Sequence, residues 1–162
     1  MDDQLTGEER RLVEHARQAV VGYNTMRHAR GGIDTLYAFL LSESGAIYDG
    51  AAYEANLAHA TICAERFAIA DMVLHESYAA RIRAILVADP VPEVQERSTP
   101  PCGTCRHLIW AHGRPDTRVI LMQYIQTKAG WIFPKLEVLA ANVLYPYPYE
   151  PQQGLWDNWQ PG

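Results

Sequence analysis

The segment Pro101-Cys-Gly-Thr-Cys-Arg106 and the earlier segment Cys63-Ala-Glu-Arg66 hold all three cysteines of the chain. Each segment opens an apolar pattern typical of a helix, which predicts helices over 61–75 and 102–112. Helix starts carry partial positive charge and free N–H groups, so they favour thiolate over thiol. If the two helices pack side by side, Cys63, Cys102 and Cys105 can bind one metal ion and leave its fourth position open.

A tetrahedral metal site with one open position is typical of catalytic zinc rather than structural zinc, because the open position can hold a water that the metal activates. Glu65 lies two residues after Cys63 and can reach over that position without binding the metal, where it would take the water's proton. Arg66 shares the face of Cys63. Its guanidinium would offset the negative charge of zinc with three thiolates.

These residues closely resemble the zinc-dependent cytidine deaminases in their small three-cysteine form. The resemblance spans roughly residues 45–113 and includes nine positions from Glu54 to Cys63. It implies hydrolytic deamination of an aminopyrimidine with release of ammonia. It also implies Cys63, Cys102 and Cys105 as Zn²⁺ ligands, Glu65 as general acid and base, and Arg66 as charge compensator.

The part of the family pattern that recognises substrate is changed in this chain. Glu54 of the family's Asn-x-Glu pair is present, but Ala52 replaces the Asn. An aromatic segment that contacts the base aligns with residues 31–34, which hold no aromatic side chain, and Tyr37 replaces a usual Gly, which should reshape the floor of the pocket. The resemblance implies substrate contacts at Ala52, Glu54 and Ala64, and at Tyr149 from a neighbouring subunit.

Three functions are open at this point. The first is deamination of a free cytidine-like nucleoside or related aminopyrimidine, with a blasticidin S deaminase-like role as one variant. The second is a non-catalytic zinc-binding module of the same fold, which would have no use for Glu65. The third is a C-x-x-C thiol oxidoreductase, which would bind no metal.

Around these motifs the hydrophobic pattern predicts a single α/β domain over residues 1–162, a three-layer α/β/α sandwich with a mixed sheet. Thr6 and the following glutamates predict the start of a helix over 8–23, which should end near Gly22. The other expected elements are strands over 35–41, 46–53, 82–88 and 119–125, a proline-rich loop over 90–101, and a last helix over 135–142.

The composition excludes several classes of partner. The chain has 162 residues, 48% of them hydrophobic, and a formal net charge of −5 with only two lysines, Lys128 and Lys135. It therefore has no basic field to bind a nucleic acid. Its apolar runs are short and its N-terminus lacks the pattern of a signal peptide, so we expect no membrane contact and a cytoplasmic location.

The C-terminal tail, residues 145–162, is predicted to be extended because prolines interrupt it repeatedly. It concentrates five aromatic side chains that it cannot bury by itself: Tyr145, Tyr147, Tyr149, Trp156 and Trp159. We expect them to pack on another subunit. The resemblance implies a homotetramer in which such a segment completes a neighbouring active site.

Overall fold

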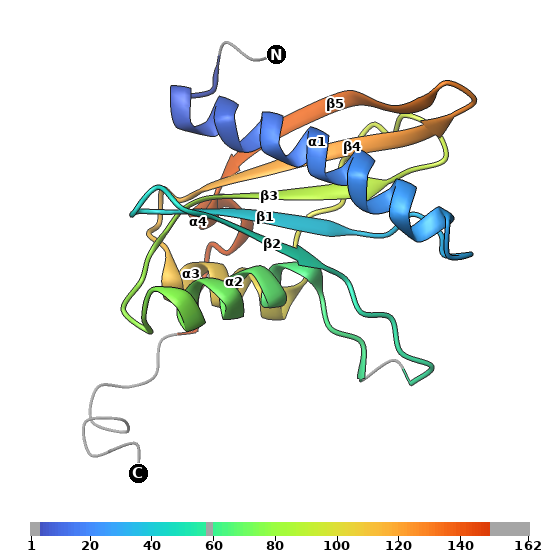
Figure 1. Cartoon of the computed structure of the whole chain (residues 1–162). Helices are drawn as coiled ribbons and strands as arrows, with labels where there is room; N and C mark the ends of the chain where they lie inside the picture. Colours follow the sequence, from blue (N-terminus) through green and yellow to red (C-terminus); the bar gives the residue numbers. More distant parts are fainter. Residues whose placement is uncertain (1–3, 58–59, 150–162) are drawn as a thin grey trace.

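The computed structural model describes residues 4–57 and 60–149. Its elements, in chain order, are α1 (Gly7–His28), β1 (Tyr37–Ser42), β2 (Ile47–Ala51), α2 (Ala64–His75), β3 (Ile82–Pro90), α3 (Gly103–His112), β4 (Arg118–Thr127), β5 (Gly130–Ala140) and α4 (Ala141–Leu144). Figure 1 shows α1 across one face of a sheet and α2 and α3 across the other. This confirms the predicted three-layer α/β/α arrangement.

The five strands stand in the order β2-β1-β3-β4-β5. Strand β1 pairs antiparallel with both β2 and β3, β3 pairs parallel with β4, and β4 pairs antiparallel with β5. The sheet is therefore mixed, as predicted. Helix α3 connects β3 to β4, because parallel neighbours need a crossover rather than a tight turn.

Helix α1 begins as predicted but ends later. The Thr6 hydroxyl accepts a bond from the backbone N–H of Glu9, and the Glu9 carboxylate accepts one from the backbone N–H of Thr6. The predicted end near Gly22 is wrong, because the buried side of the helix continues to Asn24, whose side-chain oxygen accepts a 2.7 Å bond from the Tyr37 hydroxyl. The chain turns only beyond His28, where Gly31 adopts a φ of 78°.

The predicted helix over 135–142 is also wrong. Residues 130–140 form β5, and only α4, residues 141–144, is helical. A tight turn at Gly130, with a φ of 120°, returns the chain antiparallel along β4. Pro134 is tolerated there because β5 is an edge strand and the register with β4 shifts between Gln123 and Ile125.

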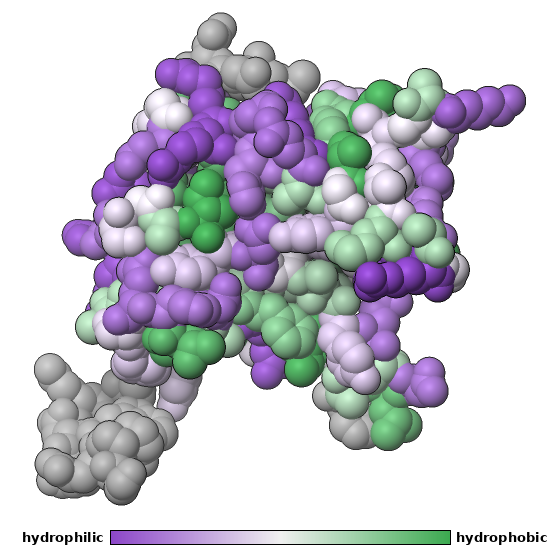
Figure 2. Space-filling view, in the orientation of Figure 1, coloured by the Kyte–Doolittle hydropathy of each residue, from purple (hydrophilic) through white to green (hydrophobic). Residues whose placement is uncertain are grey.

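Alternating side chains of the strands fill two cores on opposite faces of the sheet. In β1, Tyr37, Phe39 and Leu41 pack on the α1 side, whereas Ala38 and Leu40 pack on the side of α2 and α3. Figure 2 shows hydrophilic side chains over much of the face that α1 covers, with hydrophobic ones in separate patches. Within the described residues, no helix has the length and apolar character needed to cross a membrane.

Gly50 in β2 sets how closely α2 approaches the sheet. A Cβ atom at this position would lie 2.1 Å from the carbonyl oxygen of Ala64 and 2.8 Å from the backbone nitrogen of Ala68. Both atoms are helix backbone, so they cannot move aside without moving α2. The missing side chain at Gly50 therefore fixes the position of the first turn of α2.

We predict that Gly50→Ala displaces the start of α2 and lowers the free energy of unfolding by about 1–3 kcal/mol, the usual range for overpacking a core. Urea unfolding monitored by circular dichroism measures the change. Gly22→Ala is the matched control, because a Cβ at Gly22 meets nothing within 4 Å. It should raise stability by about 0.5–1 kcal/mol as alanine replaces glycine within a helix. Equal stability of both variants would contradict the steric role of Gly50.

Candidate metal centre and active site

Three cysteine sulfurs meet where two helices begin. Cys63 is the N-cap of α2, Cys102 is the N-cap of α3, and Cys105 lies in the first turn of α3. Neither cap side chain bonds to its own helix, so both sulfurs remain free to act as ligands. The three Sγ atoms lie within 4.8 Å of one another, and those of Cys63 and Cys102 are 3.7 Å apart. The structure therefore brings together the three residues that the sequence singled out as metal ligands.

The sulfur spacing fits zinc. Zinc–thiolate bonds of about 2.3 Å in a tetrahedral site separate the sulfurs by about 3.8 Å, close to the distance between Cys63 and Cys102. Three soft thiolate donors also match the preference of Zn²⁺ rather than that of Mg²⁺ or Ca²⁺. These three side chains would hold the ion and leave one position of a tetrahedron open.

The thiols depend on a cation for full ionisation. Burial raises the pKa of Cys63 and of Cys105, and the charge of Glu65 adds to the effect on both. Burial opposes ionisation of Cys102 as well, but the backbone N–H groups at the start of α3 and the neighbouring thiols lower its pKa overall. Adjacent thiolates repel one another, so a divalent ion among them stabilises the ionised forms.

A cavity of about 180 Å³ adjoins the cysteines. The cavity is lined by Ala52, Glu54 and Ala64, which the family resemblance implies as substrate contacts, and also by Glu65. Five further lining residues were not found from the sequence: Leu36, Thr61, Val87, Thr99 and Pro100. Of these, only Val87 could have been predicted from a general rule. Ligands of α/β proteins bind beyond the carboxyl ends of parallel strands, and Val87 lies near that end of β3.

Glu65 is the buried acid of this cavity. It is only 5% exposed, and burial raises the pKa of its carboxyl group. A raised pKa brings a carboxyl closer to the range in which it can both accept and return a proton. Its place in the first turn of α2, next to Cys63, lets it act on whatever occupies the open metal position.

Arg66 and Arg106 both lie next to the cysteines in sequence, but their guanidinium groups make different contacts. Arg66 is exposed, and within residues 4–57 and 60–149 its guanidinium has no hydrogen-bond partner. Arg106 was not singled out from the sequence, although it directly follows Cys105. Its Nε donates a 2.7 Å bond to the carbonyl oxygen of Pro101, and its Nη1 donates a 3.1 Å bond to that of Leu144. Arg106 thus ties the loop that carries Cys102 to the end of α4.

One expectation about the pocket does not match the structure. Tyr37 does not form the cavity floor, because its side chain points toward α1 and the neighbouring Leu36 lines the cavity instead. Asp34, at the position aligned with a base-contacting aromatic residue, faces away, where it accepts a 2.9 Å bond from Trp131 Nε1 and pairs with His28.

Two aromatic side chains of the C-terminal segment, Tyr145 and Tyr149, contact α3 of their own chain. Tyr149 lies outside the cavity, with its ring 6.3 Å from that of His107 in α3. The Tyr145 ring packs edge-on against His107 at 6.0 Å and against Trp110 at 6.4 Å. Trp156 and Trp159 lie outside the described residues.

Comparison with known proteins agrees with this geometry. The family model described as "Cytidine and deoxycytidylate deaminase zinc-binding region" matches residues 11–122. That range contains all three cysteines and Glu65. No curated protein matches the chain.

Solved structures share the fold. The cytidine deaminase of Burkholderia pseudomallei is 23% identical, with a TM-score of 0.58 over 71% of this chain and 81% of that one. The cytidine deaminase of Bacillus anthracis is 17% identical, with a TM-score of 0.53 over 87% of this chain and 89% of that one. At these identities the likeness shows a common fold.

We predict that Arg106→Gln weakens zinc binding about tenfold or more, because partners that position metal ligands typically contribute 10–100-fold to affinity. Competition for zinc with a chromogenic chelator measures the change. Arg114→Gln is the matched control, since Arg114 follows α3 and makes an exposed ion pair with Glu43. Unchanged zinc affinity in Arg106→Gln would show that the loop of Cys102 holds its shape without this arginine.

Proposed function

The chain belongs to the cytidine and deoxycytidylate deaminase family, whose zinc-binding region it carries over residues 11–122, and from this premise we propose its reaction. The protein catalyses hydrolytic deamination of a free cytidine-like nucleoside or a related aminopyrimidine. Water adds to the ring carbon that bears the amino group, the carbon–nitrogen bond breaks, and ammonia leaves. The ring keeps the oxygen as a carbonyl.

One observation carries the proposal: a buried carboxyl group, Glu65, shares the cavity with Cys63 and Cys102. Zinc held by Cys63, Cys102 and Cys105 supplies Lewis-acid activation of water when it is bound. Glu65 accepts the proton of the attacking water and returns it to the leaving amine. Its burial keeps competing solvent away from that proton, and its raised pKa suits both transfers.

The other proposed roles follow from position. Ala52, Glu54 and Ala64 line the cavity within reach of a small ring. Arg66, one residue after Glu65, offsets the net negative charge that three thiolates leave on a divalent ion. The wall formed by Leu36, Ala52, Val87 and Pro100 is apolar, so the substrate need not be cytidine itself. A modified cytosine nucleoside of the blasticidin S kind is a candidate substrate.

The two other functions have less support. A C-x-x-C oxidoreductase does not require a third sulfur, yet Cys63 lies 3.7 Å from Cys102. A non-catalytic zinc module does not require a carboxyl group buried beside the open side of the metal. The position of Glu65 therefore favours catalysis.

We predict that Glu65→Gln keeps its zinc and its fold but loses about 10²–10⁴-fold in turnover, the usual contribution of a general acid and base. Ammonia release from cytosine, cytidine, deoxycytidine, N4-substituted cytidines, blasticidin S and aminopurines measures activity and identifies the substrate. Asp71→Asn is the matched control, a partly exposed acid of the same helix that pairs with His75. Turnover of Glu65→Gln within about tenfold of the parent would contradict the assigned role.

We also propose that the protein is a homotetramer whose C-terminal segment completes a neighbouring site. Tyr147 is 91% exposed and Tyr149 is 65% exposed, so aromatic surface remains available next to α3. Such surface is commonly covered by another subunit.

Truncation after Leu144 should therefore reduce the assembled mass and raise KM, with zinc content unchanged because Arg106 keeps its bond to Leu144. Truncation after Tyr149 is the control that keeps the exposed tyrosines. Light scattering coupled to size exclusion, together with steady-state kinetics, gives both readouts. Parental mass and kinetics after removal of residues 145–162 would show that the tail has no part in assembly or in the site.

A further inference from the structure

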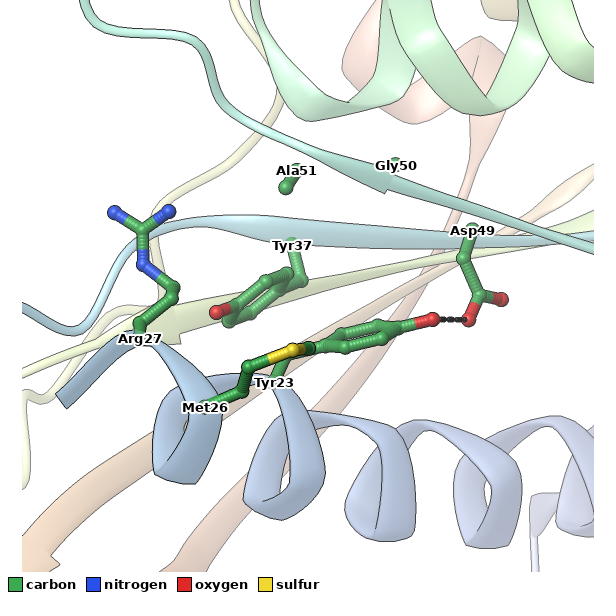
Figure 3. A pocket seen from close by; sticks show the side chains of 7 residues that line it. All are labelled: Tyr23, Met26, Arg27, Tyr37, Asp49, Gly50 and Ala51. Carbon is green, nitrogen blue, oxygen red and sulfur yellow. Dashed lines mark hydrogen bonds between the residues drawn. The ribbon is translucent and has the colours of Figure 1, made fainter. Parts of the chain in front are cut away.

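A second cavity lies on the opposite face of the sheet from the zinc site. Its volume is about 300 Å³, and it opens between the C-terminal half of α1 and the edge formed by β1 and β2 (Figure 3). The lining residues are Tyr23, Met26, Arg27, Tyr37, Asp49, Gly50 and Ala51. None of them lines the cavity beside the cysteines, so a molecule bound here would not compete for that cavity.

Arg27 is the charged side chain of this cavity that keeps free hydrogen-bonding groups. Figure 3 shows Arg27 and Asp49 at opposite ends of the cavity. Asp49 is already engaged, because one carboxylate oxygen accepts a 2.6 Å bond from the Tyr23 hydroxyl and the other pairs with His15 Nε2 at 2.8 Å. Arg27 is half-buried and uses only its Nε, which donates a 2.9 Å bond to the carbonyl oxygen of Ile33. Among the described residues, the guanidinium has no acidic partner.

The walls between these two ends suit a flat ring. The Tyr23 ring and the Met26 side chain lie side by side (Figure 3). The Tyr37 ring, which is only 1% exposed, packs against Tyr23 with the two ring centroids 5.6 Å apart at an angle of 34° and closes the cavity at its base. Thioethers and aromatic rings both make favourable contacts with a further aromatic ring. The bond from Tyr23 to Asp49 and the bond from Tyr37 to Asn24 hold both walls in place.

We propose that this cavity binds a small planar organic anion, with its ring against Tyr23 and Met26 and its carboxylate on the guanidinium of Arg27. A planar guanidinium whose two Nη groups are free binds a carboxylate through two parallel hydrogen bonds. A half-buried guanidinium without an acidic partner beside an aromatic cavity is what such a ligand requires. The site is independent of the deaminase reaction and does not rest on it.

The test uses the full-length, zinc-loaded protein and two probes of the same shape, 1-naphthoate and its neutral amide 1-naphthamide. Isothermal titration calorimetry should give saturable binding of naphthoate with a Kd below about 1 mM, and binding of the amide about tenfold weaker, since one charge-assisted pair contributes at least that factor. Phenyl phosphate, as a third probe, distinguishes a phosphate ligand from a carboxylate.

Arg27→Gln should weaken naphthoate binding at least about tenfold, by loss of the charge-assisted pair. Arg30→Gln is the matched control, because it removes the same charge three positions away without lining this cavity. Ala51→Met should fill the cavity and abolish binding of both probes. Ala51→Met thus tests the site without removing a charge. For each variant, zinc content and circular dichroism establish that the protein is folded.

Two results would overturn the proposal. One is the absence of saturable naphthoate binding up to 10 mM, on the order of the weakest affinity that such a site could offer. The other is equal naphthoate affinity in the parent, Arg27→Gln and Ala51→Met, which would place the probe elsewhere. Glu65→Gln should bind naphthoate as the parent does, which separates this site from the zinc cavity.

Discussion

The meeting of two helix N-termini on one face of the sheet is the constraint on which the rest of the site depends. Helices α2 and α3 bring Cys63, Cys102 and Cys105 within 4.8 Å of one another. Three thiols so close cannot all ionise by themselves, because each thiolate raises the free energy of the next. The positive ends of the helices reduce this repulsion only in part, and a zinc ion removes it.

The rest of the fold fixes the positions of the N-termini of α2 and α3 relative to each other. Gly50 lets the backbone of Ala64 press against β2, which sets the depth of Cys63 and Glu65 beneath the surface. At the far end of α2, one oxygen of Glu76 accepts hydrogen bonds from Ser42, Ser44 and Tyr48, which lowers the pKa of this acid. On the other helix, Arg106 joins the cysteine loop to α4. Cys63 and the loop of Cys102 are thus held by contacts with parts of the chain outside their own helices.

Sequence reasoning succeeded where the information is local. The capping box at Thr6 and the cysteine motifs act over a few residues, and their patterns predicted the start of α1 and the meeting of the three cysteines at one place. It failed where pairing or packing with another segment of the chain decides the outcome. Residues 130–140 become a strand because β4 offers them hydrogen bonds, although 135–142 have a helical pattern when taken alone. The same holds for the cavity wall at Leu36 and Thr99, and for the hydrogen bonds by which Arg106 holds the loop of Cys102. No local motif predicts these contacts.

Tyr37 shows how a single position can change its role when the sheet is assembled. Successive side chains of a strand point to opposite faces, so Leu36 and Tyr37 cannot both face the zinc cavity. Leu36 takes that place, and Tyr37 turns toward α1, where its hydroxyl bonds to buried Asn24. The bulk that Tyr37 brings therefore shapes the opposite face of the sheet and supplies a wall of the second cavity. Because β1 and β2 separate the two cavities, the face under α1 can bind its own ligand while the face under α2 and α3 keeps the geometry that zinc requires.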